Sequence, residues 1–332
     1  MTVRPTMSDV AERAGVSRAL VSIVFRDVPG ASVETRERVR AAAEDLGYRP
    51  DRRARLLSRR RTQVLGVVFA LGHEFHAELL AALYRSAAAH GQELALSGTS
   101  PGRDEGEAVG DLLALRCDAL LLLGSALTEP ALVDLAASVP TVVVARATGA
   151  AGVDVVRTDD AAGAALAARH LLDLGHTRLV HVDGARAAGA EERRRGFGEA
   201  VVAAGVSVDV VPGGLTEEDG AAAGELLLAR PALPTGLAVF NDQSAAGVLD
   251  VLQQAGRRWP ADVSVVGYDD SRLARARWAR LTTVRQDVDA LAGLAVRRAV
   301  ERVDEPDLVG REDLVAPSLV VRGSTGPPPG GR

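Results

Sequence analysis

The sequence predicts an α/β protein with two doubly wound parallel-sheet lobes, preceded by a small all-α helix-turn-helix domain. From Gln63 onward, short apolar runs alternate with helical segments, and this alternation restarts after Asp159. Before Gln63 the pattern is different and contains three short helical segments. The charge also divides there: residues 1–62 hold 14 Arg against 8 Asp and Glu, whereas the remainder holds 25 against 36. A basic N-terminal unit on an acidic body favours one face toward nucleic acid phosphates.

Residues 6–17 predict a helix, a tight turn and the cap of a second helix. Ala11 is small where the two helices cross, and Gly15 stands where the turn requires a positive φ. Ser17 is expected to cap the second helix, Arg18 to about Phe25. This helix is expected to bury Leu20, Val21 and Val24, and to turn outward Arg18, Ala19, Ser22 and Ile23. A short helix with a polar outer face fits the major groove of DNA.

A third helix is expected from about Ser32 to Leu46, with Ser32 as its N-cap and Gly47 at its end. Its apolar stripe is expected to consist of Val33, Val39, Ala42, Ala43 and Leu46. Residues 50–62 follow as an arginine-rich segment. By itself such a segment is typical of a solvated linker, but beside a DNA-reading domain a short helix is the favoured interpretation.

The remaining chain predicts the two lobes. Strands are expected at 64–70, 93–96, 119–123, 141–145, 178–182, 207–211, 236–240 and 263–267. Helices are expected at 74–90, 105–115, 129–137, 160–174, 191–204, 217–229 and 242–255. Apolar strands that alternate with helices form parallel sheets, whose ligands bind at the carboxyl ends of the strands. A cleft between the lobes is therefore the predicted ligand site, and residues 324–332 are expected to form a disordered tail.

The composition argues against several classes of protein. There is no apolar N-terminal signal core and no apolar run of membrane-spanning length, so we expect a cytoplasmic protein without membrane contact. Cys117 is the single cysteine, which leaves no intramolecular disulfide and no cysteine-based zinc site.

Enzymatic activity is not expected either. The chain contains no phosphate-binding, dinucleotide-binding or nucleophile-elbow glycine motif. The neighbouring carboxylates Asp159/Asp160 and Asp269/Asp270 are expected to diverge rather than to act as an acid–base pair. We therefore expect no cofactor and no metal, although turnover of a bound ligand would revive the enzyme alternative.

Several short motifs follow one another at characteristic spacing. They are Asp9-Val10-Ala11, Ala14-Gly15-Val16-Ser17, Leu46-Gly47-Tyr48-Arg49-Pro50, Gly175-His176, Asn241-Asp242, Val265-Val266-Gly267-Tyr268-Asp269-Asp270 and Leu281-Thr282-Thr283-Val284. With this set, the chain resembles the lac-repressor type (LacI/GalR) family of bacterial transcriptional regulators from about Val3 to Gly326.

The resemblance implies a DNA-binding domain at 1–49, a hinge helix at 50–62 and a two-lobe effector and dimerisation domain at 63–323. The N-lobe would comprise about 63–157 and 288–314, and the C-lobe about 158–285 and 315–323. A homodimer or tetramer would bind a near-palindromic operator in double-stranded DNA. A sugar or related metabolite between periplasmic-binding-protein-like lobes would change operator affinity, so a repressor is the expected function. A sugar-transport component is the alternative, against which the N-terminal domain and the missing signal segment argue.

The resemblance also implies which residues contact DNA. In the first domain these are Thr6, Ser17, Arg18, Ala19, Ser22, Ile23, Arg26 and Thr35, and in the hinge they are Arg53, Ala54 and Leu57. Arg18 could bond a guanine edge with two hydrogen bonds. Leu57 matches the leucine that wedges into the minor groove. Ile23 departs from the family pattern, which usually has a polar residue there.

The positions that match the family's effector site are Phe75, His76, Arg146, Arg193, Asn241, Asp269 and Gln286. Such side chains around an apolar floor can hold adjacent hydroxyl groups. Ala145 and Ala279 depart from the family's usual Asp and Pro. The stretch from Gly184 to Thr216 contains one aromatic residue, Phe197, and is not expected to supply an aromatic wall on which a sugar ring could stack. The effector is therefore not expected to be an ordinary pentose or hexose.

Overall fold

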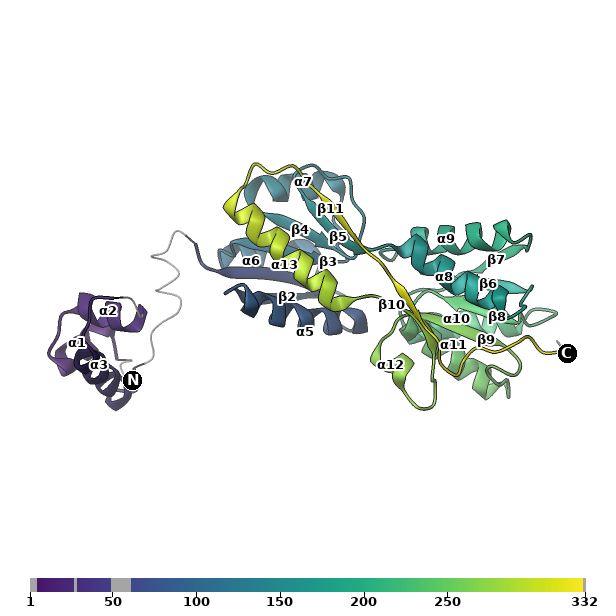
Figure 1. Cartoon of the computed structure of the whole chain (residues 1–332), viewed down its shortest axis with the longest axis horizontal. Helices are drawn as coiled ribbons and strands as arrows, with labels where there is room; N and C mark the ends of the chain where they lie inside the picture. The colour runs from purple at the N-terminus through teal and green to yellow at the C-terminus, as the bar shows by residue number, and fades with distance from the viewer. Residues whose placement is uncertain (1–4, 27–28, 49–60, 331–332) are drawn as a thin grey trace. The chain divides into compact units, whose positions relative to one another are not determined.

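The N-terminal unit contains three helices, seen in a computed structural model that describes residues 5–26, 29–48 and 61–330 (Figure 1). These helices are α1 (Met7–Ala14), α2 (Arg18–Arg26) and α3 (Val33–Asp45). Their shared core comprises Val10, Ala11, Val21, Val24, Val39, Ala42 and Ala43. Gly15 ends α1 with a φ of 65°, as the turn between α1 and α2 requires.

Two details of this unit differ from the sequence expectation. Val33 is 74% exposed rather than part of the α3 stripe. It lies six residues before Val39, and at about 100° per residue it therefore points about 120° away from the core. Leu20, Ser22 and Ile23 are all half-buried, so α2 separates its inner and outer faces less sharply than expected.

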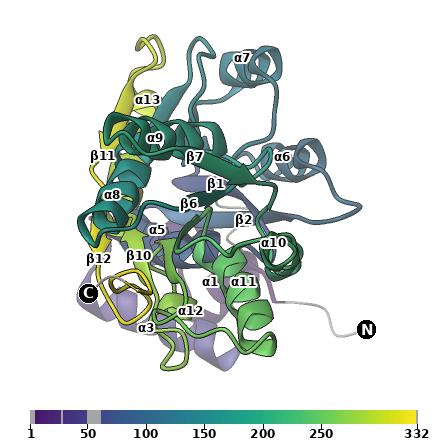
Figure 2. The same cartoon turned by 90° about the vertical axis from the view of Figure 1, so that its right-hand side faces the viewer.

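Residues 63–332 form a second compact unit with two six-stranded sheets (Figures 1 and 2). The N-lobe sheet has the order β11-β5-β4-β3-β1-β2. Its strands are β1 (Val64–Ala70), β2 (Glu93–Thr99), β3 (Ala119–Leu123), β4 (Thr141–Val144), β5 (Asp154–Thr158) and β11 (Glu312–Val315). All of its pairings are parallel. The helices of this lobe are α5 (Glu74–Ala89), α6 (Glu105–Ala114), α7 (Glu129–Ser138) and α13 (Val288–Asp304).

The C-lobe sheet has the order β12-β10-β9-β8-β6-β7, with only β12 antiparallel to its neighbour. Its strands are β6 (Leu179–Val182), β7 (Val208–Val211), β8 (Gly236–Val239), β9 (Ser264–Asp269), β10 (Thr282–Arg285) and β12 (Ser318–Val320). Its helices are α8 (Asp160–Asp173), α9 (Ala190–Ala203), α10 (Glu217–Leu228), α11 (Asp242–Gln254) and α12 (Arg272–Arg275).

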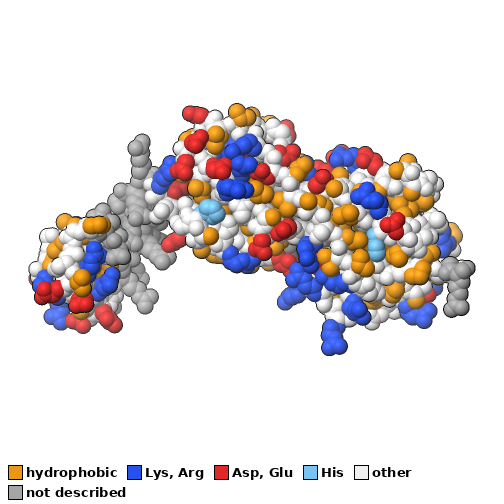
Figure 3. Space-filling view, in the orientation of Figure 1, with side chains coloured by type: hydrophobic (Ala, Val, Ile, Leu, Met, Phe, Trp, Pro, Cys, Tyr) orange, Lys and Arg blue, Asp and Glu red, His pale blue; other side chains and the backbone are white. Residues whose placement is uncertain are grey.

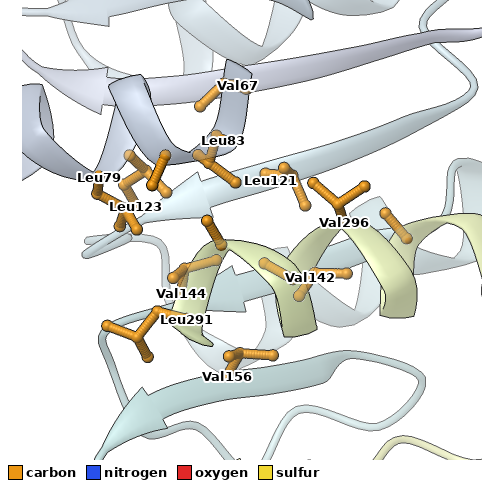
Figure 4. Packing of buried hydrophobic residues seen from close by; sticks show 14 of the residues in the cluster. Val67, Leu79, Leu83, Leu121, Leu123, Val142, Val144, Val156, Leu291 and Val296 are labelled. Carbon is orange, nitrogen blue, oxygen red and sulfur yellow. The ribbon is translucent and has the colours of Figure 1, made fainter. Parts of the chain in front are cut away.

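The chain crosses between the lobes three times, after β5, after β10 and after β11. The elements around these crossings, β5, β10, α12, α13, β11 and β12, are the ones that the pattern of apolar runs does not predict. Helices α5 and α13 cover one face of the N-lobe sheet (Figure 4). In that core, Leu79 and Leu83 of α5 and Leu291 and Val296 of α13 pack against the strand residues. Each lobe thus has its own core, and the crossings connect them.

The predicted disordered tail is wrong for its first residues. Ser324 is fully buried, accepts a hydrogen bond from the Thr282 backbone N–H at 2.7 Å and donates one to the Val265 carbonyl at 2.6 Å. The Gly326 N–H donates to the Ser264 hydroxyl at 3.0 Å. The expectation rested on the Pro- and Gly-rich composition, which begins only at Gly326, whereas Ser324 satisfies backbone groups of the C-lobe sheet.

Candidate functional site

A pocket lies between the two lobes, where the carboxyl ends of the parallel strands face each other. Its walls come from the segments that follow β1, β3 and β4 in the N-lobe and β6, β8, β9 and β10 in the C-lobe. The lining residues are His73, Phe75, His76, Gly124, Ala145, Ala188, Arg193, Phe240, Asn241, Asp269 and Gln286. The pocket thus has the place that parallel sheets give to their ligands.

Arg193 is the central charged group of the pocket. Its Nε donates to Asp160 Oδ1 at 2.8 Å, and its Nη1 donates to the Phe240 carbonyl at 2.8 Å. The guanidinium carbon lies 3.6 Å from the Tyr268 ring centroid and 4.6 Å from that of Phe240. These contacts fix the guanidinium plane, because arginine stacks on aromatic faces while it bonds a carboxylate.

A chain of side-chain hydrogen bonds links the two lobes beside Arg193. The Thr158 hydroxyl donates to Gln286 Oε1 at 2.7 Å, and Gln286 Nε2 donates to Asp269 Oδ1 at 2.7 Å. All three side chains are buried. Burial raises the pKa of Asp269 to about 7, although Arg193, 4.0 Å away, opposes the shift.

Asp269 and Asp270 point in different directions, as expected for neighbours on a loop. Both have a positive φ, 108° and 54°. Asp269 faces the pocket, whereas Asp270 pairs with Arg285 at 2.7 Å and with Arg322. The two carboxylates therefore serve different networks and do not form an acid–base pair.

Asn241 is held by the start of α11. Its Oδ1 accepts the Ser244 N–H at 2.7 Å as the N-cap, and its Nδ2 donates to the Leu215 carbonyl at 3.1 Å. These bonds leave one N–H and one lone pair for a ligand.

The N-lobe wall carries two stacked imidazoles. His76 Nδ1 accepts the Ala70 N–H at 3.1 Å, which places the proton of the neutral ring on Nε2. The ring of His73 stacks on that of His76 with centroids 4.2 Å apart. Burial lowers the pKa of His73 to about 4 and that of His76 to about 3, so both rings are neutral near pH 7. Phe75 lines the pocket and also belongs to the N-lobe core.

Of the seven effector positions inferred from the sequence, six line this pocket and Arg146 does not. Arg146 Nη1 instead donates to the Ser125 carbonyl. Sequence reasoning missed His73, Asp160, Phe240 and Tyr268. The expected lack of an aromatic wall is thereby corrected, because Phe240, directly after β8, lines the pocket although it lies outside the stretch 184–216. Phe240 and Tyr268 directly precede Asn241 and Asp269, and this adjacency was the available signal.

Two ion pairs join the lobes beside the pocket. Arg272 of α12 lies 3.7 Å from Glu74 of α5, and Arg275 lies 3.8 Å from Glu78. Arginine side chains gather over α12 on the face shown in Figure 3. Because the arginines are more than half exposed, each pair stabilises the arrangement only weakly.

In the N-terminal unit, several inferred DNA-contact residues also take part in the hydrogen bonds that cap helices. Thr6 and Asp9 form a capping box on α1, and Ser17 Oγ accepts the Leu20 N–H at 3.2 Å. Thr35 donates its N–H to the Ser32 hydroxyl. Arg18 and Ala19 are exposed on α2. The side chain of Arg26, and all of Arg53, Ala54 and Leu57, lie outside the described residues.

The described residues contain no cluster of three or more His, Cys, Asp or Glu side chains that could hold a metal ion. Within the same residues, no helix is long and apolar enough to cross a membrane.

Fold and site together define a class of protein: a helix-turn-helix DNA-binding regulator with a two-lobe effector domain. A family model for bacterial regulatory proteins of the lacI family matches residues 6–51, and one for a periplasmic binding protein-like domain matches residues 168–325. The ribose operon repressor of Escherichia coli (strain K12) is 32% identical over 327 residues, which cover 96% of this chain and 99% of that protein.

Solved structures agree with this class. A LacI transcriptional regulator from a Rhodococcus species is 45% identical with a TM-score of 0.77, covering 80% of this chain and 98% of that one. The lac repressor dimer bound to operator and the anti-inducer ONPF is 28% identical with a TM-score of 0.86, covering 98% and 100%. The chain belongs to the LacI family of bacterial transcriptional regulators. It is a DNA-binding transcriptional repressor, as the sequence predicts, and these relatives are regulators rather than enzymes.

Proposed function

We propose that this repressor binds a near-palindromic operator as a homodimer, and that a sugar or related polar metabolite in the inter-lobe pocket controls this binding. The carrying observation is the buried cluster of Arg193, Asp269 and Gln286 at the junction of the two lobes. The ribose operon repressor and the lac repressor dimer, with its operator and ONPF, support the assignment by similarity. A DNA-bound role also supports a cytoplasmic location.

The chemistry of the pocket favours a hydroxylated ligand. The guanidinium of Arg193 and the carboxylate of Asp269 can each bond two adjacent hydroxyls. Asn241 has one N–H left for a further hydroxyl. Phe75 and Phe240 offer apolar surface to the C–H face of a ring. Ala145 adds no polar group to this lining. We therefore propose a class of ligand, sugars and related metabolites, and no particular pentose or hexose.

The proposed response works through the lobe junction. A ligand that bonds both lobes favours one relative position of them, and the hinge at 50–62 would transmit this position to the DNA-binding unit. In that hinge, Arg53, Ala54 and Leu57 stay predicted DNA contacts, with Leu57 as the minor-groove wedge. By linkage, ligand and operator change each other's affinity by one common factor, typically ~5–150-fold.

The test is selection of bound duplexes from random DNA with the full chain, followed by binding of the enriched duplex at several salt concentrations with a panel of sugars. We expect a palindromic sequence whose affinity changes with one compound. That compound's own affinity should shift by the same factor when the duplex is present. No enriched sequence, or equal ligand affinity with and without the duplex, would contradict the proposal.

A further inference from the structure

The first residue of the effector domain is fixed by an aspartate from a distant part of the chain. The backbone N–H of Gln63 donates to Asp118 Oδ2 at 2.6 Å. The Gln63 carbonyl accepts the N–H of Glu93 at 2.8 Å, and the Asp118 N–H donates to the Val64 carbonyl at 2.8 Å. The amino ends of β1, β2 and β3 are thereby tied together, at the end of the strands opposite to the effector pocket.

The conformation of Gln63 gives this contact its importance. Gln63 has a φ of 59°, in the left-handed region that residues other than glycine seldom adopt. A charged carboxylate oxygen that accepts its N–H offsets the cost of that conformation. The Asp118 side chain therefore helps to hold the left-handed conformation of Gln63, the residue directly before β1.

Asp118 is itself held rigidly. It follows Arg116, whose φ is 54°, and Cys117, whose side chain is buried. A Cβ built on Gly66 of β1 would lie 3.2 Å from the Cys117 sulfur, so the thiol packs closely on this strand. The loop therefore presents the Asp118 carboxylate from a fixed position beside β1.

From this geometry we infer that Asp118 is a positioning residue for operator binding. It holds the residue at which the hinge joins the effector domain, so that a movement of the lobe is passed directly to the hinge. This inference rests on the proposed function, since it assumes that the hinge must leave the lobe in a defined direction when the repressor binds its operator. Loss of the clamp would leave Gln63 to be ordered at the moment of binding, and that ordering cost lowers specific affinity.

The experiment compares the full-length wild type with Asp118→Ala, Asp118→Asn and the control Asp134→Ala. Asp134 is an exposed aspartate on α7 of the same lobe, so its removal matches the change in charge. The probes are the duplex that the wild type selects from random DNA and a scrambled duplex of equal length. We expect Asp118→Ala to lose about tenfold or more in affinity for the selected duplex, with affinity for the scrambled duplex within about twofold.

The asparagine variant separates positioning from charge. Its amide oxygen still accepts the Gln63 N–H, so we expect it to recover most of the affinity that the alanine variant loses. Unchanged specific affinity in Asp118→Ala, or losses in Asp118→Asn and Asp134→Ala as large as the loss in Asp118→Ala, would overturn the inference.

Amide hydrogen exchange at Gln63 supplies a measurement that needs no DNA. We expect slow exchange in the wild type and in Asp118→Asn, and faster exchange in Asp118→Ala. Equal exchange in wild type and Asp118→Ala would overturn the clamp itself. If the clamp is present but the wild type selects no duplex, the proposed operator function fails and the clamp does not.

Discussion

Asp160 and Arg193 form a buried ion pair at 2.8 Å, with the side chains 4% and 7% exposed. Asp160 starts α8 directly after the chain first crosses between the lobes, and Arg193 lies on α9 in the pocket wall. The pair therefore ties the first crossing to the central cation of the pocket. Because both charges are buried, removal of either side chain would leave the other charge without its partner and would destabilise the fold.

Replacement of Arg193 by alanine should abolish the response to the effector and leave sequence-specific DNA binding. It should also lower the free energy of unfolding by about 3–5 kcal/mol, because Asp160 stays buried without its partner. Arg193→Lys keeps a charge near Asp160 but loses the planar guanidinium that bonds both Asp160 and the Phe240 carbonyl, so it should lose the response at a smaller cost in stability. Operator binding with and without effector, together with urea unfolding, measures both effects.

The control for this prediction is Arg195→Ala, since Arg195 is 55% exposed on the same helix and lies 4.0 Å from Glu199. It should change neither stability nor response beyond about 0.5 kcal/mol. A full effector response in Arg193→Lys and Arg193→Ala would show that the effector binds elsewhere.

Asp269 should make the effector domain less stable as the pH rises toward neutrality. Burial raises its pKa from 3.8 to about 7 in the folded protein. A folded pKa above the unfolded one means that the stabilisation is complete below pH 3.8 and is lost as the pH rises to about 7. The slope is at most roughly 1.4 kcal/mol per pH unit.

Urea unfolding of wild type and Asp269→Asn between pH 5 and 8 measures this contribution. The asparagine has nearly the same shape and does not titrate, so the difference between the two free energies should change up to about pH 7 and then stay constant. Parallel curves over the whole range would show that Asp269 keeps an ordinary pKa.

The sequence predicts most of the residues that line this site, but not the residues that fix the position of Arg193. Asp269 ends a strand of the C-lobe sheet, and Asn241 and Gln286 lie just after strands of the same sheet, so local pattern and family resemblance are enough to place them at one edge. Asp160 and Tyr268 act through Arg193, and their contact depends on how α8, β9 and α9 pack. No local spacing encodes a contact between elements so far apart in the chain.

Short elements show the same limit in the fold. The apolar runs predict β1, which has four consecutive buried residues at Leu65–Val68, and β3, in which every residue is buried. β11 and β12 have only four and three residues, with mostly exposed or half-buried side chains, and are too short to form a distinct apolar run. They form because the chain returns to the edge of each sheet and finds unpaired backbone groups there.

Arg18 is exposed on α2 and should contribute to base recognition. We expect Arg18→Ala to weaken binding to the selected duplex by about 1–3 kcal/mol and to relax the preference at one base position. The matched control is Arg38→Ala, which removes an equal charge from an exposed position on α3. Repeated selection with both variants measures the preference. If both variants select the wild-type sequence with equal loss of affinity, Arg18 acts only through its charge.

The C-terminal segment should stabilise the C-lobe through Ser324 rather than through the residues that follow Gly326. Ser324→Ala removes the hydrogen bonds to Thr282 and Val265 and leaves two buried backbone groups without them. We expect a loss of about 1–3 kcal/mol in the free energy of unfolding and a Tm lower by several degrees. Ser318→Ala, an exposed serine of β12, is the matched control and should change Tm by less than about 2 °C.

Truncation after Gly326 completes this test. It keeps Ser324 and the Gly326 backbone groups that bond Ser264 and His176, and it removes the Pro- and Gly-rich end. Because Pro327 and Pro329 are exposed, we expect a Tm close to that of the full chain. Thermal unfolding of the three variants and the wild type distinguishes the two parts of the segment. A Tm of Ser324→Ala equal to that of the wild type would mean that the C-lobe sheet does not depend on this serine, and a large loss on truncation would place the stabilising contacts beyond Gly326.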